Sequence, residues 1–181
     1  MGPLLALSRI IDRINTVIGR AAAWLILVAV VVSAVNAVVR KAFDVSSNAW
    51  LELQWYLFGA VVLLCAGYTL LRNEHIRIDI AVAWLPKRAR DWIEIFGIVF
   101  FLMPFALIHI WHGVPFFLHS FREQEYSSDA GGLIVWPAKL LIPVGFSLLA
   151  LQGLSELIKR IAIVMGVLPD AAAPAEHAGP H

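Results

Sequence analysis

Charged residues are scarce in this chain, and their scarcity decides the class of protein. Only 15% of the 181 residues are Asp, Glu, Lys or Arg, whereas 60% are hydrophobic. Soluble domains carry about 25% charged residues, because their surface faces water. An excess of apolar residues this large cannot be hidden in one aqueous core, so the composition predicts an integral membrane protein. With 14 basic and 13 acidic residues, the chain has neither a basic field for nucleic acid nor an acidic tail.

Several kinds of chemistry lack the residues that would carry them. The single cysteine, Cys65, lies in an apolar run, where it cannot form an intramolecular disulfide and is expected to be a small core hydrophobe. The chain has no nucleophile–base pair, no glycine-rich phosphate loop and no Cys/His metal spacing. We therefore predict no catalytic residues, no cofactor and no metal site. No internal repeat is visible either, although many secondary transporters consist of repeated halves.

Four long apolar segments predict an all-α membrane protein with four transmembrane helices. They cover about residues 21–39, 50–71, 92–111 and 140–158. The first makes roughly 28 Å of helix, close to the hydrocarbon thickness of about 30 Å. A cleaved signal peptide ending near Val35-Asn36-Ala37 is the alternative for this segment. Its apolar run is longer than the usual 7–15 residues of a signal peptide, which favours a retained helix.

The flanks of the transmembrane domain (residues 21–160) have patterns of their own. Residues 1–20 are amphipathic, which predicts a helix lying in the membrane interface or a simple extension of the first span. The apolar face holds Leu4, Leu7, Ile10, Ile11, Ile14, Val17 and Ile18, and the polar face holds Ser8, Arg9, Asp12, Arg13, Asn15 and Thr16. Between the second and third spans, residues 79–85 predict a cytoplasmic interfacial segment. Residues 161–181 form a cytoplasmic tail, partly disordered because its end is rich in Ala and Pro.

Basic residues predict that both termini lie in the cytoplasm (N-in/C-in). One side receives Arg9, Arg13, Arg20, Arg72, Arg77, Lys87, Arg88, Arg90, Lys159 and Arg160, and the other receives only Arg40, Lys41, Arg122 and Lys139. This imbalance satisfies the positive-inside rule. Tryptophans give an independent check, since all seven fall near a predicted interface: Trp24, Trp84 and Trp92 near inner ends, and Trp50, Trp55, Trp111 and Trp136 near outer ends.

Ionisable residues are missing from the centre of the predicted spans, where pumps and transporters place theirs. The interior polar residues, Ser33, Asn36, Thr69, Ser147 and Gln152, are interpreted as bridges between helices. Five glycines, Gly59, Gly67, Gly97, Gly145 and Gly153, are interpreted as points of close helix approach. Pro104 and Pro143 lie inside spans and predict kinks.

Three histidines on one face of the third helix and its extension, His109, His112 and His119, raise the alternative of a haem-bearing anchor. Haem b in a four-helix anchor needs axial histidines that face each other across the bundle. The other histidines, His75, His177 and His181, fall in a loop and in the tail, so no facing pair is expected. A membrane anchor of a redox complex, with or without haem, remains the second interpretation. A self-sufficient small transporter or channel is the third.

Two stretches carry a family resemblance. The first is Glu52-Leu53-Gln54-Trp55-Tyr56, followed by an apolar helix with glycine and then by Leu71-Arg72-Asn73-Glu74-His75-Ile76-Arg77-Ile78-Asp79. The second comprises Gly131-Gly132-Leu133, Trp136-Pro137, Lys139, Ile142-Pro143 and Leu151-Gln152-Gly153-Leu154. With the four-span layout, residues 20–160 resemble the small membrane subunit (DctQ-like) of tripartite ATP-independent periplasmic (TRAP) transporters.

The resemblance implies a division of labour that fits the missing central charges. A large membrane subunit (DctM-like) would carry the substrate and sodium sites and move, while a periplasmic solute-binding protein (DctP-like) would deliver an organic acid. The small subunit would sit in the bacterial inner membrane, brace the large one and help dock the binding protein. Matching positions are Glu52, Glu74, His75, Arg77, Asp79, Trp136, Pro137, Lys139 and Pro143. We expect Arg122, Glu123, Glu125 and Asp129, in the outer loop, to contact the binding protein.

Overall fold

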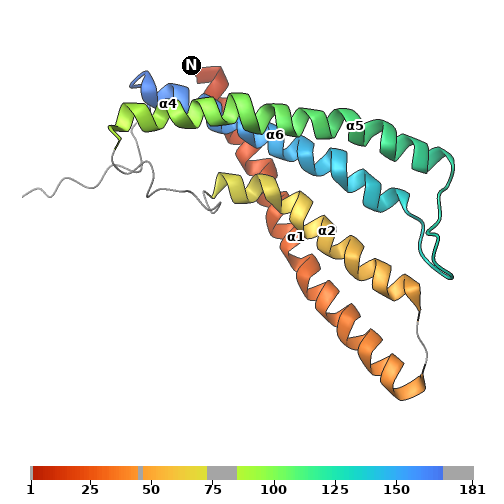
Figure 1. The fold of residues 1–181 in the computed structure, drawn as a ribbon. Coiled ribbons are helices and arrows are strands. Elements are labelled where there is room, and N and C mark those ends of the chain that lie inside the picture. The colour runs from red at the N-terminus through yellow and green to blue at the C-terminus, as the bar shows by residue number, and fades with distance from the viewer. Residues whose placement is uncertain (1, 45–46, 73–84, 169–181) are drawn as a thin grey trace, which may run out of the picture.

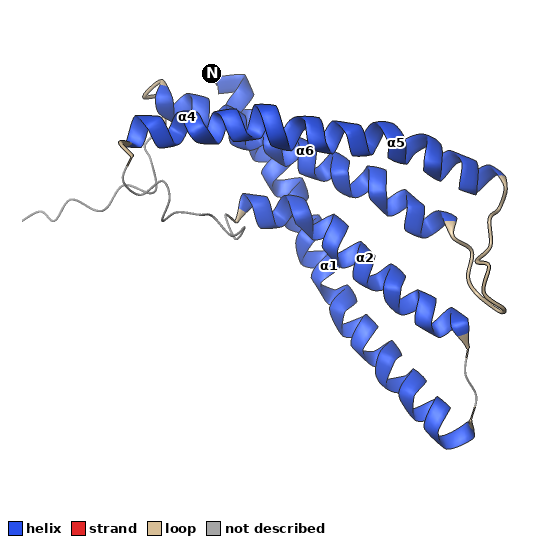
Figure 2. Ribbon diagram, viewed as in Figure 1, coloured by secondary structure: helices blue, strands red, loops and turns tan. Residues whose placement is uncertain are grey.

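The computed structural model describes residues 2–44, 47–72 and 85–168, and this part of the chain is helical apart from its loops (Figures 1 and 2). The elements are α1 (Gly2–Phe43), α2 (Asn48–Leu71), α4 (Lys87–Gly97), the π-helical turn η1 (Ile98–Leu102), α5 (Met103–Arg122) and α6 (Trp136–Val164). Since α4, η1 and α5 run on without interruption, the described residues contain four helices that are long and apolar enough to cross a membrane. Each predicted span lies inside one of them, so the prediction of four spans is confirmed.

The four long helices form an open layer in which α2 and α6 pack together in the middle. Helix α1 flanks α2, α5 flanks α6, and α1 also crosses α6. Figure 1 shows the α1–α2 hairpin diverging from the α5–α6 hairpin towards their connecting loops. We call the end with residues 44–47 and 123–135 the loop end. The end where α1 begins and α6 ends is called the terminal end.

Helix α1 has no break at residue 20, where the amphipathic segment was expected to meet the first span. Its 42 residues make about 63 Å of helix, roughly twice the hydrocarbon thickness. Residues 2–20 are thus helically continuous with the first span, and whether they lie in the membrane interface stays a prediction. The polar face of this extension does not all point to solvent, because Ser8 and Asn15 are buried.

Glycines explain how closely the middle helices approach. A Cβ on Gly145 of α6 would lie 2.8 Å from the Leu63 carbonyl oxygen of α2, and one on Gly67 would overlap the Asn15 amide oxygen. Gly153 likewise faces Leu102. Close approach is therefore confirmed for Gly67, Gly145 and Gly153. For Gly59 and Gly97 it stays a prediction, because a Cβ there would meet nothing within 4 Å in the part of the chain described.

Prolines disturb the helices in different ways. Pro104 follows directly on the π-helical turn, in which the Met103 N–H bonds the Ile98 carbonyl five residues back. Proline has no N–H, and its ring would clash with the preceding turn of an ordinary α-helix. The wider π-helical turn makes room for Pro104. Pro143 is buried inside α6, and its carbonyl accepts a hydrogen bond of 2.6 Å from the Ser147 hydroxyl. Pro115, inside α5, was not singled out from the sequence.

Two predicted segments lie outside the described residues. The cytoplasmic interfacial segment at 79–85 falls almost wholly within 73–84, and the end of the tail falls within 169–181. Helix α6 continues to Val164, beyond the boundary at residue 160 that was expected between the transmembrane domain and the tail.

Candidate functional site: the loop-end surface and the helix crossing

The loop between α5 and α6 is attached to the neighbouring hairpin through Glu52 of α2. The Glu52 carboxylate accepts the Leu133 N–H at 2.6 Å, and its other oxygen accepts the Ser127 hydroxyl. The loop passes so close that a Cβ on Gly132 would lie 2.7 Å from the Glu52 Oε1. Glu52, which the resemblance singled out, is therefore a tether between the two hairpins. Its partners Ser127 and Leu133 could not be found from the sequence.

Two further side chains of α2 bind the same loop. Asn48 donates to the Ala130 carbonyl at 3.0 Å, and the Tyr56 hydroxyl donates to the Ile134 carbonyl at 3.3 Å. The loop also holds itself together, because Ser127 N–H bonds the Leu133 carbonyl and Tyr126 pairs with Ile134 in an isolated antiparallel bridge. The loop is consequently an ordered surface rather than a loose connection.

Lys139 fixes the base of the loop from the first turns of α6. Its ammonium pairs with the Glu125 carboxylate and lies 4.1 Å from the centre of the Phe116 ring. The hydrogen bond from Lys139 lowers the pKa of the Glu125 carboxyl below its ordinary value. Glu125, predicted to contact a partner, is thus engaged within the chain.

Trp136 and Pro137 begin α6 beside this ion pair. The Trp136 ring meets the Phe121 ring edge-on, with 5.3 Å between centroids. Pro137 lies in the first turn of the helix, where its missing N–H leaves no intrahelical bond unmade. These two matched positions therefore set where α6 starts and how it meets the end of α5.

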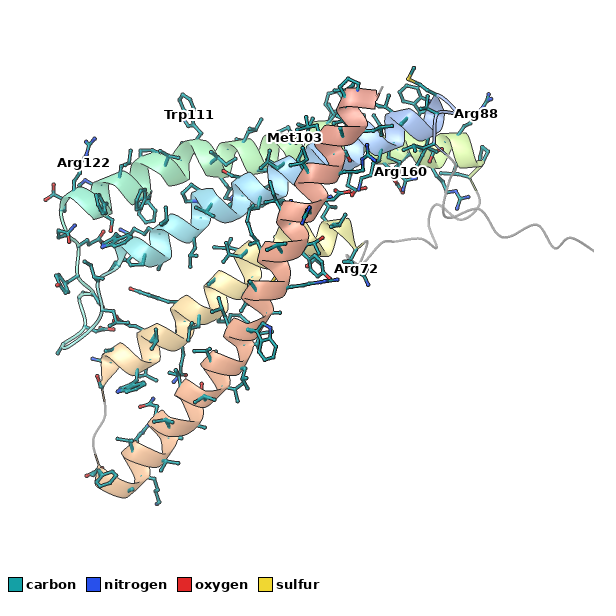
Figure 3. The ribbon with its side chains drawn as sticks, turned by 180° about the vertical axis from the view of Figure 1, so that it is seen from behind. Arg72, Arg88, Met103, Trp111, Arg122 and Arg160 are labelled. Atoms are coloured by element: carbon teal, nitrogen blue, oxygen red, sulfur yellow. The ribbon has the colours of Figure 1, made fainter. Side chains whose placement is uncertain are left out.

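Arg122, Glu123 and Asp129 are the exposed members of the predicted docking set. Figure 3 shows Arg122 at the loop end of α5, opposite to Arg88 and Arg160 at the terminal end. Tyr126 is also exposed on this loop. An arginine, two carboxylates and a phenol on an ordered loop are suited to binding a polar protein surface.

A buried polar network joins α1 to α6 at their crossing. Asn15 donates to the Gln152 amide oxygen at 3.0 Å, and Gln152 donates to Asp12 at 2.8 Å and to Glu156 at 3.0 Å. Asn15 and Gln152 are both 0% exposed. The interpretation of Gln152 as a bridge between helices is confirmed.

Serines and a lysine complete this network. Ser155 donates to Asp12 at 2.7 Å, and its hydroxyl lies 2.7 Å from that of Ser8. Lys159 pairs with both Asp12 and Glu156. The polar face of residues 1–20 is thus partly a packing surface. Ser8 and Asp12 lie one helical turn apart, and this spacing was the sequence signal for the contact. The sequence analysis used it only to define the polar face of the segment.

Arg160 joins the terminal ends of α4 and α6. It donates to the Asp91 carboxylate at 3.1 Å and also pairs with Glu94. Asp91 is buried, so Arg160 compensates a charge that would otherwise be costly. The ionisable groups of the described residues that pair in this way lie at the terminal end or the loop end.

The three histidines of α5 have different surroundings. His109 donates through Nδ1 to the Phe105 carbonyl at 2.7 Å and stacks on Phe146 with 4.3 Å between ring centroids. His112 and His119 are exposed. Among the residues that are described, no group of three His, Cys, Asp or Glu side chains could hold a metal ion.

Four residues of the matched motif, Glu74, His75, Arg77 and Asp79, lie outside the described residues. Their predicted role in fixing the turn after α2 therefore stays a prediction.

Comparison with known proteins gives one match. Residues 27–162 match the family described as Tripartite ATP-independent periplasmic transporters, DctQ component. The chain has no significant match among curated proteins or solved structures. The matched region covers most of the chain and includes all or part of every long helix. This chain therefore belongs to the DctQ family, the membrane-spanning and non-enzymatic small component of TRAP transporters of the inner membrane.

Proposed function

We propose that this DctQ subunit is the static brace of its transporter and presents a docking surface for the periplasmic solute-binding protein. Its partners are then a large DctM-like membrane subunit and a DctP-like binding protein. The transported solute is an organic acid taken up with sodium. The sodium sites lie in the large subunit, and this chain carries no cofactor.

The observation that carries this proposal is the placement of the paired charges. Asp12, Glu156 and Lys159 are tied together at the terminal end, and Glu125 is tied to Lys139 at the loop end. Groups that move ions across a membrane lie near its centre and change partners. Charges engaged at both ends of a helical layer support a fixed scaffold instead.

The docking role is supported by the way the 123–135 loop is mounted. Glu52, Asn48 and Tyr56 hold it to a different hairpin from the one it connects. A surface held at two sides keeps its shape when a partner binds, which reduces the ordering cost of association. Arg122, Glu123 and Asp129 would make the contacts, because their side chains are exposed.

The proposed orientation places both termini in the cytoplasm and the 123–135 loop in the periplasm. It is supported by the basic residues that gather towards the terminal end. Single cysteines introduced in the Cys65→Ala background test it, using a membrane-impermeant maleimide on right-side-out vesicles. Ser128→Cys should react and Arg88→Cys should not. The reverse pattern would overturn the orientation and, with it, the docking surface.

Reconstitution tests the division of labour directly. Proteoliposomes containing this chain alone, this chain with the large subunit, and both with the binding protein are given a sodium gradient and labelled organic acids. Uptake should require all three proteins. Accumulation of a solute by this chain alone would disprove the proposal.

Charge reversals on the loop test the docking role within the complete system. Arg122→Glu, Glu123→Lys and Asp129→Lys together should lower uptake at limiting binding protein by at least tenfold. Excess binding protein should restore it, since only affinity is weakened. Arg88→Gln, an exposed cation at the opposite end, is the matched control. Unchanged uptake with the triple variant would exclude this loop as the docking surface.

A further inference from the structure

A groove between α1 and α2, on the loop-end half of their hairpin, holds polar side chains that have no hydrogen-bond partner. The groove has a volume of about 700 Å³, and its walls are mainly apolar, with Val30 and Phe58 among them. Ser33 from α1 and Gln54 from α2 also line it. Neither side chain makes a hydrogen bond within the described part of the chain, and neither does Asn36, one turn beyond Ser33.

The other interior polar residues behave differently. Gln152 bonds across to α1, Thr69 bonds the Cys65 carbonyl at 2.9 Å, and Ser147 bonds the Pro143 carbonyl. Bridging was predicted for all five interior polar residues, and it holds only for Gln152. Ser33 and Asn36 lie in the loop-end half of α1, and Figure 1 shows the α1–α2 hairpin diverging from α5–α6 towards that end.

Lipid is a poor occupant for this groove. Acyl chains offer no hydrogen bonds, and an unsatisfied amide within the hydrocarbon costs several kcal/mol. Asn36 lies about 6 Å, and Ser33 about 10 Å, along α1 from Arg40, the first charged residue at that end. Both are therefore inside the apolar stretch that begins at residue 21.

Gly59 gives the groove the shape of a helix-binding surface. It lines the groove, and a Cβ there would meet nothing within 4 Å, so it does not serve packing inside the chain. A glycine on an exposed helix face lets a second backbone approach closely, as small residues do between membrane helices. Trp55, 79% exposed, stands at its rim.

The exposed face of the third span contrasts with this groove. Over residues 96–108 it is aromatic and aliphatic, with Phe96, Phe100, Phe101, Phe105, Leu107 and Ile108 all exposed. Acyl chains can cover such a face without leaving a polar side chain unpaired. Of the two surfaces, the α1–α2 groove is the one whose polar side chains would gain hydrogen bonds from a protein partner.

We infer that this groove binds a transmembrane helix of the large subunit, which seats a small residue against Gly59 and supplies hydrogen bonds to Ser33 and Gln54. The inference rests on the proposed function, because it takes the partner to be the large membrane subunit. It goes further by naming the face of the chain that forms the joint. The joint then lies at the level of the hydrocarbon, on the opposite edge of the layer from α5.

Replacing Gly59 with a larger residue tests the inference. A tagged chain is co-expressed with the large subunit, extracted in mild detergent and purified through its tag. Gly59→Leu should reduce the co-purified large subunit at least tenfold. Gly97→Leu, at another helical glycine with open space around it, should leave co-purification unchanged. Circular dichroism and the yield of the tagged chain check that both variants fold.

A photo-crosslink identifies the occupant. A benzophenone maleimide is attached to Ser33→Cys in the Cys65→Ala background, with Leu107→Cys on the third span as the control. Irradiation should join position 33, and not position 107, to the large subunit. Adducts of position 33 with lipid only, or with a second copy of this chain, would overturn the inference.

The two proposals can fail separately. If the wild-type chain and Gly59→Leu retain the large subunit equally, the groove is not the joint while the bracing role stands. If the wild-type chain does not retain the large subunit at all, the bracing role fails and the inference fails with it.

Discussion

Asn15 of α1 donates its amide hydrogen to the Gln152 amide oxygen of α6 at 3.0 Å, and both side chains are completely buried. Gln152 in turn donates to the carboxylates of Asp12 and Glu156. Both carboxylates also pair with Lys159. This pair is the centre of the α1–α6 crossing. It attaches α1 to α6.

Replacement of Gln152 by Leu should lower the free energy of unfolding in detergent by about 1–3 kcal/mol, because buried polar groups lose their partners. Denaturant titration followed by circular dichroism measures it. Ser147→Ala, which removes a hydroxyl bonded only within its own helix, should change stability by less than about 0.5 kcal/mol. Equal effects of the two substitutions would show that the crossing network adds nothing beyond a local bond.

Gly145→Ala should force α6 away from α2. The new Cβ would lie 2.8 Å from the Leu63 carbonyl oxygen, and a backbone atom cannot turn aside as a flexible side chain can. We expect a loss of about 1–3 kcal/mol in the free energy of unfolding. Gly97→Ala is the control, and it should raise stability by up to about 1 kcal/mol through helix propensity. A neutral Gly145→Ala would mean that the two helices are not in close contact.

Glu52→Ala should release the 123–135 loop without unfolding the helices. The Leu133 N–H and the Ser127 hydroxyl lose their acceptor, and the loss falls on the loop rather than on the helices. Hydrogen exchange read by mass spectrometry should speed up in the loop and stay unchanged in α6. Glu52→Gln keeps a carbonyl acceptor and should give an intermediate effect. Faster exchange throughout the chain would instead make Glu52 a determinant of the whole fold.

Acid should loosen the same loop through Glu125. Because Lys139 lowers the pKa of the Glu125 carboxyl, the native state favours the ionised form. The stabilisation is complete above the ordinary carboxyl pKa of 4.5 and is lost as the pH falls through the lowered native value. Loop proteolysis by pepsin should therefore rise below about pH 4.5. Glu125→Gln should remove this part of the pH dependence, and an unchanged profile in that variant would assign it to another group.

The number of membrane-crossing segments was available from the sequence because it depends on local composition. A run of apolar residues about 20 long must cross a membrane whatever surrounds it. All four predicted spans were found inside observed helices, and residues 27–162 match the family model. The resemblance also singled out Glu52, but its hydrogen bonds to the 123–135 loop were not foreseen.

The partners of the polar residues depended on how the helices pack in three dimensions. Glu52 binds Leu133 across 81 positions of sequence, and Asn15 binds Gln152 across 137. Periodicity places a residue on a face of its helix but does not say whether water, lipid or another helix covers that face. For the same reason Ser8 and Asn15 were placed only on the polar face of their helix, and Gly59 was interpreted as a point of close approach without a named neighbour. The surroundings of Ser8 and Asn15 follow from the crossing of α1 and α6, and those of Gly59 from the open groove between α1 and α2. Both are properties of the whole assembly of helices rather than of any one segment.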